Sequence, residues 1–223
     1  MDGTIQPVLQ RVDTATLHDR VYQEVRRAIM AGLYAPGQTL SLNQISQVLG
    51  TSVMPVREAL RRLAAERAVE ILPKRGVQIP AITREKYAEL GRVRLHMEGM
   101  ATEIAAPTIT SSELDALEIA CDEMNEIALD PTKWQAYVVR NHEFHFAIYR
   151  GGRPHVLLPI IESLWLQSGP LLSLYRERGV VKKRGLHEAV IAALRARDPV
   201  AARIAMQRDV QNGIDFISSV APF

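Results

Sequence analysis

The chain has 223 residues, of which 47% are hydrophobic and 23% charged, the proportions of an ordinary folded protein with one large or two small domains. Its net charge of +2 is too small to identify a nucleic-acid-binding protein, although residues 1–80 hold 10 Lys and Arg against 7 Asp and Glu. The single cysteine, Cys121, excludes a disulfide within the chain, and we find neither a signal-peptide pattern nor an apolar run that approaches the ~20 residues of a membrane span. We therefore expect a cytoplasmic protein.

The first predicted element is a helix over residues 17–31. Thr16 can cap its first turn, and apolar residues recur at every fourth position, namely Leu17, Val21, Val25 and Ile29. Residues 1–13 have no such periodicity, so we expect a flexible arm before the helix. The apolar stripe is expected to pack beneath the two helices that follow.

The pattern of residues 41–67 predicts a helix, a tight turn and a second helix. The first helix follows a Ser41 cap and stops at Gly50, which suits the left-handed geometry of a turn. Ser52 can cap the second helix, and Pro55 lies where its missing N–H is not needed. The second helix has an apolar stripe of Val56, Leu60 and Leu63, with Arg57, Arg61 and Arg62 largely on other faces. This is the layout of a DNA-recognition helix, with a merely solvated arginine face as the alternative.

Two short strands are predicted after the second helix. The β-prone runs Val69 to Leu72 and Val77 to Ile79 flank the basic turn Pro73, Lys74, Arg75 and Gly76. Such a hairpin is a wing, and Gly76 would let its tip approach a DNA backbone closely. We therefore predict a winged helix-turn-helix over residues 1–80, with one helix in the major groove and the wing along the backbone or minor groove.

Residues 81–223 are predicted to form a second, all-helical domain. Pro80, Ala81 and Ile82 make a short connection, and Thr83 can cap the next helix. Helices are predicted at residues 84–106, 112–129, 132–150, 155–168, 170–178, 182–197 and 199–218. The fold class is therefore mainly α, an N-terminal winged helix-turn-helix followed by an all-α bundle of about six to seven helices.

Residues 14–80 resemble the GntR superfamily of bacterial transcription factors. The segment LYAPGQTL at 33–40, PVREAL at 55–60 and RGV at 75–77 occur in the family's order and spacing. One departure is Val53, where the family usually has arginine, so one expected DNA contact is altered. Arg57 can grip guanine O6 and N7 from the start of the recognition helix, whereas phosphates suit the other basic residues. The predicted DNA-binding set is Ser52, Met54, Arg57, Arg61, Lys74, Arg75 and Gly76.

The second domain resembles the FCD ligand-binding domain of the FadR-like branch of GntR regulators. The matching segments are RLHME at 94–98, NHEFH at 141–145, HEAVI at 187–191 and AMQRD at 205–209. The resemblance implies a divalent metal, zinc or nickel, held where the family has an aspartate and three histidines. Those positions are Asn141, His145, His187 and Asp209 here, so two match and two differ. It also implies that Arg94 reaches into the cavity, where its guanidinium can bind a carboxylate.

These features predict a homodimeric transcriptional regulator, more precisely described as a repressor of a palindromic operator, whose DNA binding is controlled by a small organic acid beside the metal. It is not expected to be an enzyme or to bind a membrane. Several alternatives remain open at this point. The histidines could be buried packing residues, Arg94 could form an ion pair between helices with an acid such as Glu98, and the bundle could be a metal-dependent hydrolase or a ligand-free dimerisation domain of a structural DNA-binding protein.

Overall fold

The computed structural model describes residues 17–72, 76–178 and 185–223, and it is mainly helical, as predicted. The predicted cap Thr16 and the arm at 1–13 lie outside the described residues. The elements are α1 (Leu17–Met30), β1 (Thr39–Leu40), α2 (Leu42–Val48), α3 (Val53–Ala65), β2 (Glu70–Leu72), β3 (Gly76–Gln78), α4 (Arg84–Ala105), α5 (Ser111–Ile127), η1 (Pro131–Lys133), α6 (Trp134–Gly151), α7 (Leu157–Ser168), η2 (Gly169–Leu174), α8 (Tyr175–Arg178), α9 (Leu186–Arg195) and α10 (Pro199–Val220).

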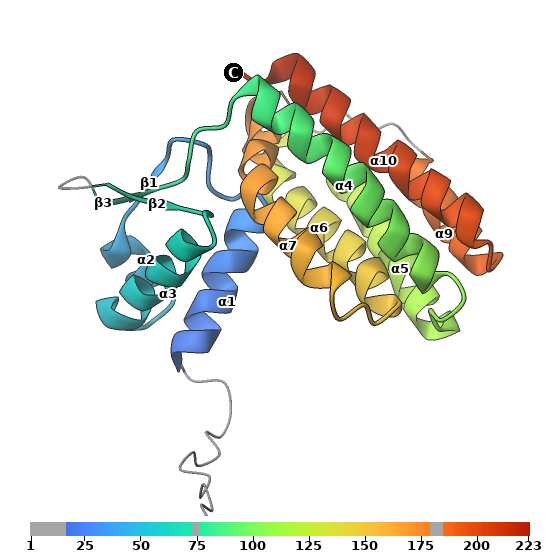
Figure 1. Cartoon of the computed structure of the whole chain (residues 1–223), viewed down its shortest axis with the longest axis horizontal. Helices are drawn as coiled ribbons and strands as arrows, with labels where there is room; N and C mark the ends of the chain where they lie inside the picture. The colour runs from blue at the N-terminus through green and yellow to red at the C-terminus, as the bar shows by residue number, and fades with distance from the viewer. Residues whose placement is uncertain (1–16, 73–75, 179–184) are drawn as a thin grey trace, which may run out of the picture.

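The N-terminal elements α1 to β3 form a small unit, called the head below, on one side of the molecule (Figure 1). Its core joins the predicted stripe of α1 to the apolar stripe of α3, so that Val25, Ile29, Val56, Leu60 and Leu63 are buried. Helix α1 packs along α3, and α2 packs across α3. The expected packing of α1 beneath the helix-turn-helix is therefore present.

The head contains a three-stranded antiparallel sheet in the order β1-β3-β2. Strands β2 and β3 form the predicted hairpin, with Ile71 opposite Val77, while residues 73–75 at its turn lie outside the described residues. Strand β1 was not predicted, because two residues are too short to show an alternating pattern. It pairs Leu40 with Val77 and ties the hairpin to the chain before α2.

Helices α4 to α10, called the bundle below, make up the rest of the described chain (Figure 1). The long helices α4 and α10 lie side by side, and α9 packs against α10. The predicted segments are found within about four residues of their expected ends, except that 170–178 divides into η2 and α8 and that residues 182–184 lie outside the described residues. Cys121 is buried.

Residues 157–174 form an apolar stretch of the bundle, with a mean hydropathy of 1.2 over 18 residues. This stretch meets the length and composition of a membrane span, so the expectation that no run approaches one was too strict. It is, however, 56% buried inside the protein, and α7 packs between α4 and α1. Its apolar character is therefore explained by its place in the core.

The head is held against the bundle by close packing at the end of α1. Gly32 ends α1 with φ +73°, and a Cβ there would lie 2.7 Å from the carbonyl oxygen of Gly169. A Cβ on Gly169 would overlap the backbone of Met30. Arg26 adds an ionic bridge, since its guanidinium lies 3.5 Å from Glu66 at the end of α3 and 3.0 Å from Glu162 on α7. These two glycines and Arg26 therefore contribute to holding the head against the bundle.

Candidate functional site

Helix α3 presents a polar face to solvent. Met54, Arg57, Glu58 and Arg61 are exposed and recur at helical spacing, while the opposite stripe of α3 is buried against α1. Arg57 has no ion pair among the described residues, and Arg61 lies 3.9 Å from Glu58 with 64% of its side chain exposed. The exposed face therefore offers two arginines that can rearrange to meet another molecule.

Arg62 differs from these two arginines because it is held by α1. Its guanidinium lies 2.7 Å from the Asp19 carboxylate and 3.9 Å from the ring centre of Tyr22. It therefore stabilises the head. Ser52 is exposed at the start of α3 in an extended conformation, but its side chain makes no capping hydrogen bond, which differs from the predicted cap. Its hydroxyl is consequently available to a ligand at the N-terminus of α3.

The described part of the wing agrees with a surface that another molecule can approach. Gly76 has φ +86°, and no atom of the described residues lies within 4 Å of a Cβ placed there. Lys74 and Arg75, which were predicted to contact DNA, lie outside the described residues. The structure thus places Met54, Arg57 and Arg61 on α3, with Ser52 directly before its first residue, and Gly76 on β3.

A second candidate site lies within the bundle, where α6, α9 and α10 bring three ligand-type side chains together. The Nε2 atom of His145 lies 3.2 Å from one carboxylate oxygen of Asp209, and Nε2 of His187 lies 3.4 Å from the other. All three side chains are buried or nearly so, and their ligand atoms lie within 4.8 Å of one another. Asn141 lines the same cavity one helical turn before His145.

A chain of hydrogen bonds orients His145. Its Nδ1 atom lies 3.0 Å from the Tyr149 hydroxyl, which donates its own proton to the buried carboxylate of Glu98. The hydroxyl oxygen therefore accepts from Nδ1–H, and in the neutral ring Nε2 carries a lone pair directed at Asp209. A second proton on the ring lets Nε2 donate a hydrogen bond to Asp209, and a metal ion between the two groups would hold them together in the same way.

Arg94 lies beside this group and lines the same cavity. Its Nε donates to Glu98 at 2.6 Å, one of its terminal nitrogens lies 3.3 Å from the Ser168 hydroxyl, and its guanidinium lies 4.5 Å from the ring centre of Trp165. The ion pair with Glu98 that was considered as an alternative is therefore present, but within α4 rather than between helices. The same arginine still borders the cavity, so the ion pair and a ligand contact are compatible.

Neighbouring charges and hydrogen bonds offset the cost of burying the charged groups of this cavity. Burial alone would raise the pKa of the Asp209 carboxyl, but attraction to His187 and the hydrogen bond with His145 hold that pKa below its usual value. Burial would likewise lower the pKa of the Arg94 guanidinium, yet the charge and hydrogen bond of Glu98 raise it. Burial raises the pKa of Tyr87, Tyr137 and Tyr175 on the cavity wall. The cavity therefore combines fixed charges with neutral phenols.

The donor set fits a divalent transition metal. Two imidazole nitrogens and a carboxylate are ligands that zinc and nickel accept, and the buried Tyr149 and Glu98 provide the outer hydrogen bonds that orient such ligands. In the family's pattern the aspartate ligand lies at the position of Asn141 on α6, and a histidine lies at the position of Asp209 on α10. In this chain α6 offers the neutral amide of Asn141 instead, and the carboxylate comes from Asp209 on α10. The remaining histidines behave as packing or surface residues. His142 is buried against Phe146 with its pKa lowered to about 3 by burial, and His18, His96 and His155 are exposed.

Comparison with known proteins identifies the chain. The pattern of the FCD domain matches residues 89–212, and the pattern described as "Bacterial regulatory proteins, gntR family" matches residues 17–79. The chain belongs to the GntR family and carries an FCD domain. This GntR-family protein is therefore a regulator of transcription and not an enzyme, which removes the hydrolase alternative.

Similar proteins span nearly the whole chain. The HTH-type transcriptional regulator McbR of Escherichia coli (strain K12) is 27% identical over 201 residues, which cover 87% of this chain and 90% of McbR. The HTH-type transcriptional repressor GlaR of the same organism is 26% identical over 211 residues, covering 88% of this chain and 93% of GlaR. The solved structure of E. coli McbR/YncC superimposes with a TM-score of 0.82 at 25% identity, covering 92% of this chain and 99% of that chain.

Proposed function

We propose that this GntR-family protein represses transcription by binding a palindromic operator as a homodimer, and that a small organic acid bound beside a metal in the bundle controls this binding. The observation that carries the proposal is the pairing of two surfaces in one chain. One is the exposed arginine face of α3, and the other is a buried cavity with a guanidinium and a metal-type donor set. The name of GlaR as a repressor favours repression over activation.

The DNA-binding part of the proposal assigns a base contact to Arg57. Its exposed guanidinium is free of ion pairs among the described residues, so it can form two hydrogen bonds to a guanine in the major groove. The Arg57→Ala variant is expected to lose about 1 to 3 kcal/mol of operator binding free energy with relaxed base preference, measured by fluorescence anisotropy. Arg92→Ala, which removes an exposed arginine from α4, is the matched control. Equal operator binding by both variants would refute the docking of α3.

Dimerisation follows from the small basic surplus of the head. With few charges, one head gains little from phosphate contacts, whereas two heads on related half-sites add their binding energies. We place Ser52, Met54, Arg61, Lys74, Arg75 and Gly76 around Arg57 at the DNA. A monomer by light scattering at the concentrations that saturate an operator would contradict this arrangement.

The metal part of the proposal assigns His145, His187 and Asp209 as ligands, with Asn141 as a weak fourth. A bound Zn²⁺ or Ni²⁺ would supply a Lewis acid that anchors a carboxylate. Purified protein is expected to contain close to one such ion per chain by plasma emission spectrometry. Ion addition to stripped protein should raise the melting temperature because the ion binds the folded state. The His187→Ala variant should lack the bound ion and show no rise in melting temperature on ion addition. The His155→Ala variant, changed at an exposed histidine, should retain both the ion and the rise.

The effector part of the proposal assigns Arg94 as the partner of an acid. The cavity of about 60 Å³ that Arg94 lines is small and polar, which supports a short acid rather than a long acyl chain. A panel of short carboxylic and hydroxy acids is expected to include compounds that raise the melting temperature of the metal-loaded protein. Arg94→Lys keeps the positive charge but removes the planar fork, so calorimetry should show weaker binding of those acids. Unchanged binding would exclude this role for Arg94.

The route from the cavity to the head is short. Arg94 contacts the Ser168 hydroxyl, and the next residue, Gly169, packs directly on the backbone of Met30 at the end of α1. An acid that draws the Arg94 guanidinium toward the metal would alter its contact with Ser168. We infer that this step lets the acid favour one placement of the head over another.

A further inference from the structure

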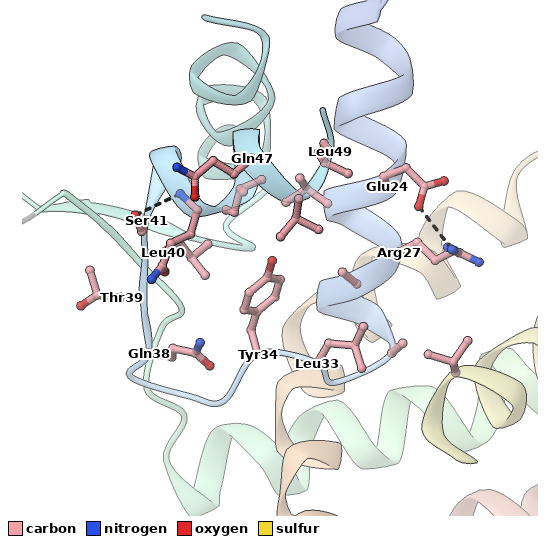
Figure 2. A pocket seen from close by; sticks show the side chains of 17 residues that line it. Glu24, Arg27, Leu33, Tyr34, Gln38, Thr39, Leu40, Ser41, Gln47 and Leu49 are labelled. Carbon is pink, nitrogen blue, oxygen red and sulfur yellow. Dashed lines mark hydrogen bonds and ion pairs between the residues drawn. The ribbon is translucent and has the colours of Figure 1, made fainter. Parts of the chain in front are cut away.

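A second, larger cavity lies at the junction of the head and the bundle, separate from the cavity that Arg94 lines. Its volume is about 600 Å³, within the range of sites that hold small organic molecules. Figure 2 shows its side chains converging from α1, from the loop before β1 and from α2. One wall residue, Val139 on α6, comes from the bundle.

The lining of this cavity is mainly apolar. Most of its lining residues are aliphatic, and Leu40 and Ile45 among them belong to the buried core of the head. The polar residues are mostly amides and hydroxyls. Such a surface gains free energy by contact with an apolar molecule.

The charges at the cavity neutralise one another. Its charged lining residues are Glu24 and Arg27, whose side chains lie 3.2 Å apart (Figure 2). Arg27 also lies 3.3 Å from Glu143 on α6. No charge of either sign in the described lining therefore lacks a partner. This distinguishes the cavity from the one at Arg94 and disfavours an ionic ligand, which would lose its hydration without gaining an opposite charge.

The Tyr34 hydroxyl is a polar group of this cavity that forms no hydrogen bond with the described protein. The ring of Tyr34 rises from the loop into the cavity with its hydroxyl directed toward α2 (Figure 2). Within residues 17–72, 76–178 and 185–223 the structure gives this hydroxyl no hydrogen-bond partner, and burial raises its pKa, so it stays a neutral donor. The neighbouring Gln38, in contrast, accepts from the backbone N–H of Ala35 at 2.9 Å.

We propose that this cavity binds a neutral, mainly apolar small molecule that carries a hydrogen-bond acceptor, which the Tyr34 hydroxyl would meet. The site goes beyond the proposed acid-controlled function, because its ligand differs in charge and its walls are almost entirely in the head. Its occupant touches α2 of the helix-turn-helix and Val139 of the bundle together. A ligand in this cavity would therefore affect the position of the head relative to the bundle.

The test uses the full chain and the fluorophore 6-propionyl-2-dimethylaminonaphthalene, a neutral bicyclic molecule with one ketone acceptor. We expect saturable binding of one probe per chain, with a blue-shifted emission. Ala28→Trp fills the cavity from α1 at a half-buried position and should abolish binding. Ala116→Trp, at an exposed alanine of α5, is the matched control and should bind like the unmutated protein. Val139→Trp fills the cavity from the bundle and should also abolish probe binding. It provides the same test if Ala28→Trp does not fold.

Tyr34→Phe tests the chemistry of the site rather than its volume. It keeps the ring and removes the donor, so probe affinity should fall by about 2- to 10-fold, the usual worth of one neutral hydrogen bond. The anionic probe 8-anilinonaphthalene-1-sulfonate should bind this site less tightly than the ketone. Binding that does not saturate, that survives both tryptophan substitutions or that prefers the anion would overturn the proposal. These outcomes leave acid binding at Arg94 untouched, so the two proposals fail independently.

Discussion

Glu98 shows how much one buried charge can contribute to this protein. It is fully buried on α4, accepts from Arg94 at 2.6 Å and also accepts from Tyr149. Glu98→Gln keeps the shape but leaves the buried guanidinium without its counter-charge, so the free energy of unfolding should fall by roughly 3 kcal/mol in urea titrations. Glu118→Gln breaks the exposed pair with Arg195, 2.8 Å apart, and should change stability by less than about 1 kcal/mol. Equal effects would show that the Arg94 ion pair is solvated.

The residues of the bundle cavity differ in how far the sequence predicts them. Asn141 and His145 are four apart, so one helix face was predictable, but grouping them with His187 and Asp209 required the family resemblance because these residues are distant in sequence. The Arg94–Glu98 ion pair was predictable because the two residues are four apart on one helix, a spacing that brings their side chains together. The roles of Tyr149 and Ser168 were not predictable, since they depend on how α4, α6 and α7 pack.

At the scale of elements, the contact between α1 and the end of α3 is tuned by Tyr22. Its hydroxyl donates to Glu66, and burial together with this hydrogen bond raises the pKa of Tyr22 to about 12. The tyrosine of the unfolded chain titrates near pH ~10, so this contribution to stability is complete below pH ~10 and is lost as the pH rises toward 12. We expect Tyr22→Phe to be less stable than the unmutated protein at pH 8 and the difference to shrink between pH 10 and 12. A constant difference in urea unfolding would contradict the assigned hydrogen bond.

The elements themselves were largely predictable, and the exceptions have physical causes. Long helices such as α4 and α10 repeat their apolar pattern over many turns, so periodicity identifies them well. Strand β1 has two residues and exists because β3 offers it hydrogen bonds, which no local pattern encodes. Ser52 occupies the expected position before α3, but its hydroxyl makes no capping hydrogen bond. The local sequence does not determine whether this bond forms.

For the molecule as a whole, the placement of the head depends on a backbone contact that side chains would block. A methyl group on Gly169 would overlap the backbone of Met30, so Gly169→Ala must push α1 away from the bundle. We expect a loss of about 1 to 3 kcal/mol in the free energy of unfolding, the usual effect of overpacking. Hydrogen exchange should quicken in α1 and α2, while α4 and α10, which pack mainly on each other, should keep their protection.

Gly213 in α10 provides the matched control, because no atom in the described part of the chain lies within 4 Å of a Cβ placed there. Gly213→Ala should leave the head in place and stabilise the helix by up to about 1 kcal/mol, since alanine loses less backbone freedom than glycine. If Gly169→Ala behaves like Gly213→Ala in both stability and exchange, the head is not fixed by this contact. The route from Arg94 through Ser168 to α1 would then lose its last step, and an acid in the bundle would need another way to reach the DNA-binding face.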